Sequence, residues 1–109
     1  MEDGNLFVHT GGALAENILV SANPCTLLGV WFDSDGSDGT ITMPFVVELV
    51  DEAATADIGA QSKSLYRNTI ADPAGKIDGL NFVIKAGKGI CIKMPALGTN
   101  DVKIGVVWR

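Results

Sequence analysis

Side chains that usually carry catalysis or bind metals are scarce in this sequence of 109 residues. It has one histidine, His9, and two cysteines, Cys25 and Cys91, far apart along the chain. Nucleophilic catalysis normally needs a positioned base, most often histidine, and a zinc site needs several nitrogen or sulfur ligands. No Gly-x-Ser-x-Gly motif is present. The sequence therefore predicts a protein that is not an enzyme and that has no cofactor or metal.

Long apolar runs and targeting signals are also missing. No stretch approaches the roughly 20 apolar residues of a membrane span, and the N-terminus lacks the cationic start and apolar run of a secretory signal. We therefore expect no membrane contact and synthesis in a cytosol. There Cys25 and Cys91, both inside apolar strand-like runs, are expected to be reduced and structural, a disulfide between them being the alternative.

Charged residues are few and unevenly distributed. They make up 19% of the chain, below the ~25% of ordinary domains, so apolar surface stays exposed unless a partner covers it. Residues 1–57 carry a charge of −10 and residues 58–109 a charge of +5. The opposite charges either pair within one subunit or make neighbouring subunits complementary. The acidic total and the absence of a basic patch mixed with aromatics argue against nucleic-acid binding.

The remaining pattern is that of β-strands. Apolar residues alternate with polar ones in residues 80–85, 90–94 and 101–109, and further strand-like runs occupy 16–21, 25–32 and 41–51. No long helix or internal repeat is apparent. The sequence predicts one all-β domain, an antiparallel β-sandwich of jelly-roll or Greek-key type with six to eight strands over residues 16–109. Residues 1–15, with their Gly11-Gly12 pair, are expected to form an extended N-terminal arm.

Two short motifs have alternative interpretations. Asp33, Asp35 and Asp38 form a carboxylate-rich turn that could meet a cation, but the segment lacks the glycine and glutamate that an EF-hand loop requires, which favours a solvated turn. Gly87-Lys88-Gly89 resembles a fragment of a phosphate-binding loop. It lacks the leading glycine and the following Ser/Thr, so a glycine turn joining two antiparallel strands is the better interpretation.

Five segments together resemble the small β-sandwich proteins that decorate the heads of tailed phages. These segments are Ile18 to Pro24, Thr26 to Trp31, Val47 to Ala54, Gly87 to Ile92, and Val102 to Trp108. The resemblance spans roughly residues 17–109, and its motifs are generic strand patterns. Ala22-Asn23 replaces the expected glycine, the final Arg109 is unusual, and residues 1–15 have no counterpart.

The resemblance implies a virion protein on the capsid surface, made in the host cytoplasm. Such a protein, often a trimer, binds the major capsid protein across seams between its subunits. Because interfaces are commonly anchored by aromatic residues and arginine, the candidate contact residues are Leu6, Phe7, Trp31, Phe32, Trp108 and Arg109. A tail or baseplate subunit is one alternative. Another is a small carbohydrate-binding module, for which Trp31-Phe32-Asp33 is the candidate cluster.

Overall fold

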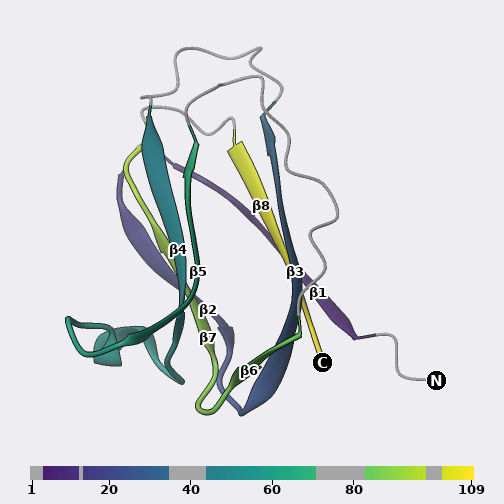
Figure 1. Ribbon diagram of the computed structural model, residues 1–109. Coiled ribbons are helices and arrows are strands. Elements are labelled where there is room, and N and C mark those ends of the chain that lie inside the picture. Colours follow the sequence, from purple (N-terminus) through teal and green to yellow (C-terminus); the bar gives the residue numbers. More distant parts are fainter. Residues whose placement is uncertain (1–3, 13, 35–43, 71–82, 98–101) are drawn as a thin grey trace.

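The protein is a sandwich of two four-stranded antiparallel β-sheets (Figure 1). The computed structural model describes residues 4–12, 14–34, 44–70, 83–97 and 102–109. Sheet A contains β1 (Asn5–Thr10), β8 (Val102–Trp108), β3 (Cys25–Ser34) and β6 (Ile84–Ala86), in that order. Sheet B contains, also in order, β2 (Glu16–Ser21), β7 (Ile90–Met94), β4 (Phe45–Asp51) and β5 (Lys63–Ile70).

The strand orders β1-β8-β3-β6 and β2-β7-β4-β5 are those of a jelly roll. In this fold two Greek keys wrap eight strands into two facing sheets. All pairings are antiparallel. The all-β sandwich predicted from the alternating pattern is therefore confirmed.

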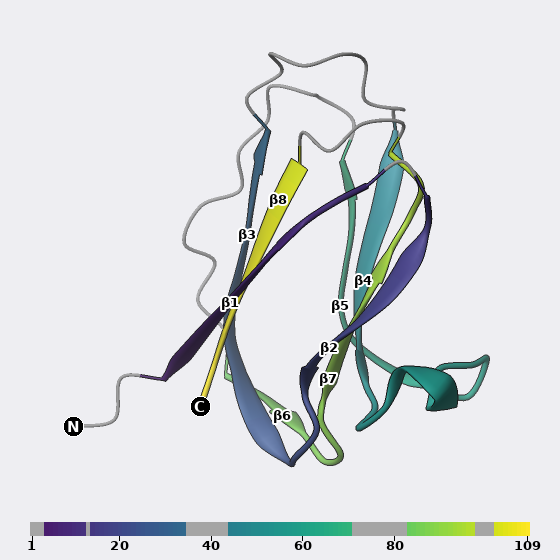
Figure 2. The same ribbon diagram turned by 180° about the vertical axis from the view of Figure 1, so that it is seen from behind.

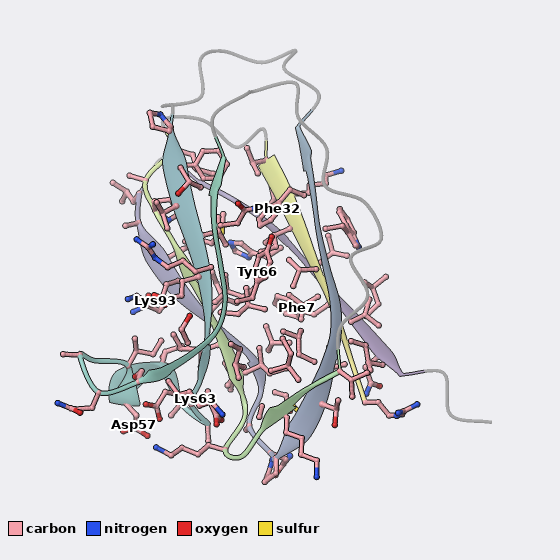
Figure 3. All side chains as sticks on the ribbon, viewed as in Figure 1. Phe7, Phe32, Asp57, Lys63, Tyr66 and Lys93 are labelled. Atoms are coloured by element: carbon pink, nitrogen blue, oxygen red, sulfur yellow. The ribbon has the colours of Figure 1, made fainter. Side chains whose placement is uncertain are left out.

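Apolar side chains from both sheets fill the space between them. The largest fully buried ones include Leu27, Phe32, Leu49, Ile92 and Ile104. Phe32 of β3 stacks across this space on Tyr66 of β5, with ring centroids 6.5 Å apart (Figure 3). Because the facing sides of the central strands β3, β4, β7 and β8 are apolar, burying them against each other drives the two sheets together.

The segment expected to be an N-terminal arm is, from Asn5 to Thr10, an edge strand of sheet A. This strand, β1, pairs with β8 from Asn5↔Trp108 to Thr10↔Lys103. The chain then crosses to sheet B (Figure 2), and the Gly11 amide donates to the Val102 carbonyl at 2.7 Å. The glycine pair therefore lies in a connection that is hydrogen-bonded to β8 and is not a hinge. Residues 5–12 belong to the sandwich, so the expected boundary between an arm and the domain at residue 15 is corrected for these residues.

The three strand-like runs at the C-terminal end share one alternation pattern, but they do not all belong to one sheet. The pieces Ile84–Ala86 and Val102–Trp108 lie in sheet A, whereas Ile90–Met94 lies in sheet B. The turn Gly87-Lys88-Gly89 therefore carries the chain from one sheet to the other. Alternation shows which side chains face a core, but not which sheet a strand joins.

A β-bulge reverses the expected orientation of one residue in β3. The register shifts between Leu27 and Gly29, so Leu27 is buried in the core together with Val30 and Phe32. Strict alternation along residues 25–32 would instead place Leu27 on the opposite face, with Trp31. The extra residue in the bulge changes the phase of the pattern.

The segment between β4 and β5 covers one end of the outer face of sheet B. It contains the short 3₁₀ helix η1 (Thr55–Asp57), which contacts β2 and lies at the lower end of the molecule in Figure 1. Val50 and Cys91 are buried but stand outside the cluster between the sheets. The Cys91 thiol donates to the Glu52 carbonyl at 3.4 Å, so this segment closes a second, smaller apolar cluster.

Candidate functional site

The outer face of sheet A carries a line of apolar side chains that the core does not use. In β1, Leu6 is 62% exposed and Val8 47% exposed. They lie beside Val107 and Gly105 of β8, and Gly105 lies beside Trp31 of β3. The apolar strip, as we name this surface, consists of Leu6, Val8, Leu28, Trp31 and Val107.

Trp31 lies directly over Gly105. A β-carbon added at Gly105 would overlap three atoms of the indole ring, so only glycine leaves room for the ring to rest on the β8 backbone. The ring is therefore held against the sheet in the middle of the apolar strip. This arrangement gives the strip a flat aromatic centre.

Replacing Gly105 with alanine is expected to push the indole of Trp31 off the sheet. We expect a loss of about 1–2 kcal/mol in the free energy of unfolding, the usual cost of a small overpacking. The indole N–H signal of Trp31 in an NMR spectrum should shift, and urea denaturation would measure the stability. Gly59→Ala is the matched control, because a β-carbon there meets nothing within 4 Å. An unchanged Trp31 signal in the Gly105 variant would contradict the stacked arrangement.

A row containing two cations borders the strip at one end. Thr26 and Arg109 exchange two backbone hydrogen bonds of 2.9 Å, and Thr26 lies opposite Lys85 of β6. Their sequence neighbours Cys25, Leu27, Ile84 and Trp108 all pack on the core, so the three side chains project outward. We call this set (Lys85, Thr26 and Arg109) the basic row. At the other end of the strip, Lys103 lies opposite Asp33 in the register.

The six contact residues expected from the sequence separate into two groups. Leu6, Trp31 and Arg109 lie on the outer face of sheet A. Phe7 and Trp108 are partly buried against the core, and Phe32 is 2% exposed inside it. The predicted cluster Trp31-Phe32-Asp33 is therefore not one surface, because Trp31 and Phe32 point to opposite sides of β3.

Other contributors to this surface were missed from the sequence: Val8, Leu28, Val107 and Lys85. The continuous apolar run Leu6-Phe7-Val8 was a usable signal for a strand with apolar side chains on both sides. The positions of Val107 and Lys85 next to the other residues depend on strand pairing, which no local pattern reveals.

The outer face of sheet B holds a polar groove. A row of side chains crosses all four strands, following the register Asn17↔Lys93↔Glu48↔Arg67. With Ala15, Val46, Met94 and Pro95 these residues line a cavity of about 340 Å³. The Lys93 ammonium lies 3.3 Å from the Glu48 carboxylate; Figure 3 shows Lys93 pointing away from the core.

Glu48 is held in its charged form. A hydrogen bond from Ser64 lowers the pKa of its carboxyl, and Lys93 and Arg67 lower it further, against the opposing effect of partial burial. Glu48 belongs to the acidic half of the sequence and Lys93 to the basic half. Lys88 and Glu52, 3.5 Å apart, form a second such pair. These oppositely charged halves therefore pair, at these two places, within one subunit.

The Gly87-Lys88-Gly89 turn binds an anion that the chain itself supplies. The Asp51 carboxylate accepts hydrogen bonds from the backbone amides of Gly87, Lys88 and Gly89, at 2.9, 2.8 and 3.2 Å. Burial raises the pKa of Asp51, but these three amides and the charge of Lys63 outweigh it, so the pKa is lowered. A turn whose amides are already occupied is a structural junction rather than a phosphate site.

The two cysteines are free thiols, as expected for reduced, structural residues. Burial raises the pKa of Cys91, and the negative charges of Glu52 and Asp57 raise it further. The buried thiol is therefore protonated at neutral pH.

Within the described ranges, no group of three His, Cys, Asp or Glu side chains is placed to hold a metal ion. Asp35 and Asp38 of the carboxylate-rich turn lie outside those ranges. The helical content of the described chain includes nothing long and apolar enough to span a membrane. Compared with family models, curated proteins and solved structures, the chain has no match in any of the three.

Proposed function

We propose that this protein is a structural virion protein that decorates a phage capsid and stabilises it. It binds across the seams between major capsid subunits, acts as a trimer, and uses neither catalysis nor a cofactor. Its place is the capsid surface after synthesis in the host cytoplasm.

The observation that carries this proposal is the apolar strip on the outer face of sheet A. Leu6 and Val8 leave a large fraction of their apolar surface in water, and Trp31 and Val107 extend the same surface. Contiguous exposed apolar surface bordered by polar groups marks a site of protein contact. Burying it across a seam adds stabilising area to both flanking capsid subunits. The jelly roll is also a fold that viral capsid proteins use.

The direct test adds the purified protein to empty heads from which it has been removed. We expect saturable binding and a higher temperature of head disruption. The protein would bind the intact shell and not the disrupted one, and a ligand stabilises the state that it binds. Sedimentation of heads with bound protein and calorimetry of the shells would measure both effects. A protein that neither binds heads nor raises their resistance to heat would contradict the proposal.

The trimeric state is tested separately. Sedimentation velocity and native mass spectrometry over a range of concentrations are expected to show three copies of the 11.4 kDa chain. A chain that stays monomeric at high concentration would remove the trimer from the proposal while leaving capsid binding open to its own test.

The polar groove of sheet B favours a second candidate function, carbohydrate binding. Asn17, Lys93, Glu48 and Arg67 offer hydrogen-bond donors and acceptors in one row, beside the apolar side chains of Val46 and Pro95. A glycan array would test it, with Glu48→Gln as the variant expected to lose any binding.

A tail or baseplate subunit would use the apolar strip in the same way as a head protein, and locating the chain in the virion by electron microscopy distinguishes the two.

A further inference from the structure

We infer that the capsid surface receiving sheet A is apolar at its centre and carries carboxylates along the border that meets Lys85 and Arg109. This inference rests on the proposed function and adds to it the chemistry and orientation of the contact. The partner is thus the major capsid protein, recognised through an acidic border beside an apolar patch.

The first argument is the order of side chains across the face. The apolar strip occupies the centre, where Val8, Gly105 and Trp31 are adjacent in the register. The basic row lies beyond Val107, since Arg109 is the next residue of this chain segment on the same face and follows the last residue of β8. Lys85 and Arg109 are both exposed. A partner that covered the strip would bring its own side chains over these two cations.

The second argument is the identity of the charges. In the described part of the chain, Lys85, Lys103 and Arg109 are the basic residues on this face, and Asp33 is the acidic residue opposite Lys103 in the register. Among the residues that the structure describes, none opposite the basic row is acidic, and Thr26 is the neighbour that Lys85 and Arg109 share. A partner that covers these cations must provide carboxylates there, because a charge removed from water without a counter-charge is strongly disfavoured.

The same charges argue against a second copy of this chain as the occupant. If two copies met face to face through sheet A, the basic row of one would lie over the basic row of the other, or over the register pair of Lys103 and Asp33, which has no net negative charge to balance it. Like charges juxtaposed at an interface are repulsive and suppress that pairing. A surface bordered by acidic residues avoids this repulsion, which is why we assign the face to the capsid rather than to self-association.

The test measures binding to heads that lack the protein, with two matched pairs of variants. Lys85→Gln combined with Arg109→Gln removes both cations of the basic row, and Lys63→Gln combined with Lys88→Gln makes the same charge change at exposed positions in and beside sheet B. Leu6→Asp places a carboxylate in the apolar strip. Leu19→Asp does so on the outer side of sheet B, where Leu19 is 42% exposed in the edge strand β2. Urea denaturation checks that all four variants fold.

We expect each sheet A variant to weaken binding at least tenfold and each sheet B variant to leave it within about twofold. The wild-type affinity should fall as salt is raised, and it should fall less steeply once Lys85 and Arg109 are neutralised. Leu6→Asp should leave the oligomeric state unchanged in sedimentation.

Each other outcome has a distinct meaning. If the wild type binds heads and the sheet A variants bind equally well, or the sheet B variants are the ones that lose binding, the inference is overturned and the proposed function stands. If Leu6→Asp dissociates the oligomer, a second copy covers the face and the inference is again overturned. If the wild type does not bind heads at all, the proposed function fails and the inference fails with it.

Discussion

Replacing Gly89 with alanine is expected to destabilise the protein by about 3 kcal/mol, at the upper end of the cost of overpacking. A β-carbon at Gly89 would overlap the Ser21 carbonyl oxygen and come within 2.9 Å of the Glu52 carbonyl oxygen and 3.1 Å of the Ala53 Cα. All three contacts are backbone atoms, so no side chain can rotate away to relieve them. The turn between β6 and β7 would have to separate from the end of β2 and from the start of the segment that joins β4 to β5.

The midpoint of urea denaturation would measure this loss. Gly87→Ala is the matched control two residues earlier in the same turn, since a β-carbon there meets only the Asp51 Oδ2 at 3.6 Å. That distance is ordinary van der Waals contact. Equal stabilities for the two variants would show that the close approach at Gly89 does not limit this junction.

Replacing Asp51 with asparagine is expected to lower the free energy of unfolding by about 2 kcal/mol at neutral pH. Both carboxylate oxygens accept backbone hydrogen bonds: Oδ1 from Lys88 and Gly89, and Oδ2 from Gly87. An asparagine keeps one acceptor oxygen and turns an NH₂ group toward an amide that also donates. It removes the negative charge as well, so at least one buried donor loses its partner.

The pH dependence gives this prediction a second measurement. The pKa of Asp51 is lowered in the folded protein, so its contribution is fully present above the ordinary carboxyl pKa of about 3.9 and is lost as the pH falls through the folded value. Denaturation curves for both proteins at pH 7 and pH 3 should show the gap between them narrowing in acid. A gap that is constant across this range would show that the charge of Asp51 does not stabilise the turn.

Local patterns were enough to predict most of the strands of this fold. Residues 16–21 and 90–94 form strands with the expected bounds, because each run is a short apolar alternation ended by glycine or proline signals. The segment between β4 and β5 contains the short 3₁₀ helix η1. The fold class follows from these strands together with the absence of any long helical pattern.

What could not be predicted depends on pairing between distant segments. β1 was missed because both sides of an edge strand in this sandwich carry apolar residues, so Asn5 to Thr10 shows no clear alternation. The core position of Leu27 depends on the bulge in β3. The internal anion at the Gly87-Lys88-Gly89 turn comes from Asp51, 36 positions earlier than Gly87, and a loop motif cannot show whether its amides are already occupied.

Which of the six candidate contact residues lie on the outer face of sheet A was predictable only in part. Residue type alone selected Leu6, Trp31 and Arg109, since aromatic, apolar and arginine side chains commonly anchor interfaces. The same rule also selected Phe7, Phe32 and Trp108, which pack on the core. Orientation separates the two groups, and orientation follows from the register of β1, β3 and β8.

The pairing of Asn5 with Trp108 decides how the protein can be used to display cargo. A peptide inserted before Asn5 or after Trp108 would emerge at the same end of sheet A, beside Leu6 and Arg109, where it would compete with the proposed docking face. Because Asn5 and Trp108 are register partners, a short linker could join these two strands in a circular permutant. New ends opened in the exposed turn at residues 59–61 would then present cargo from the opposite sheet.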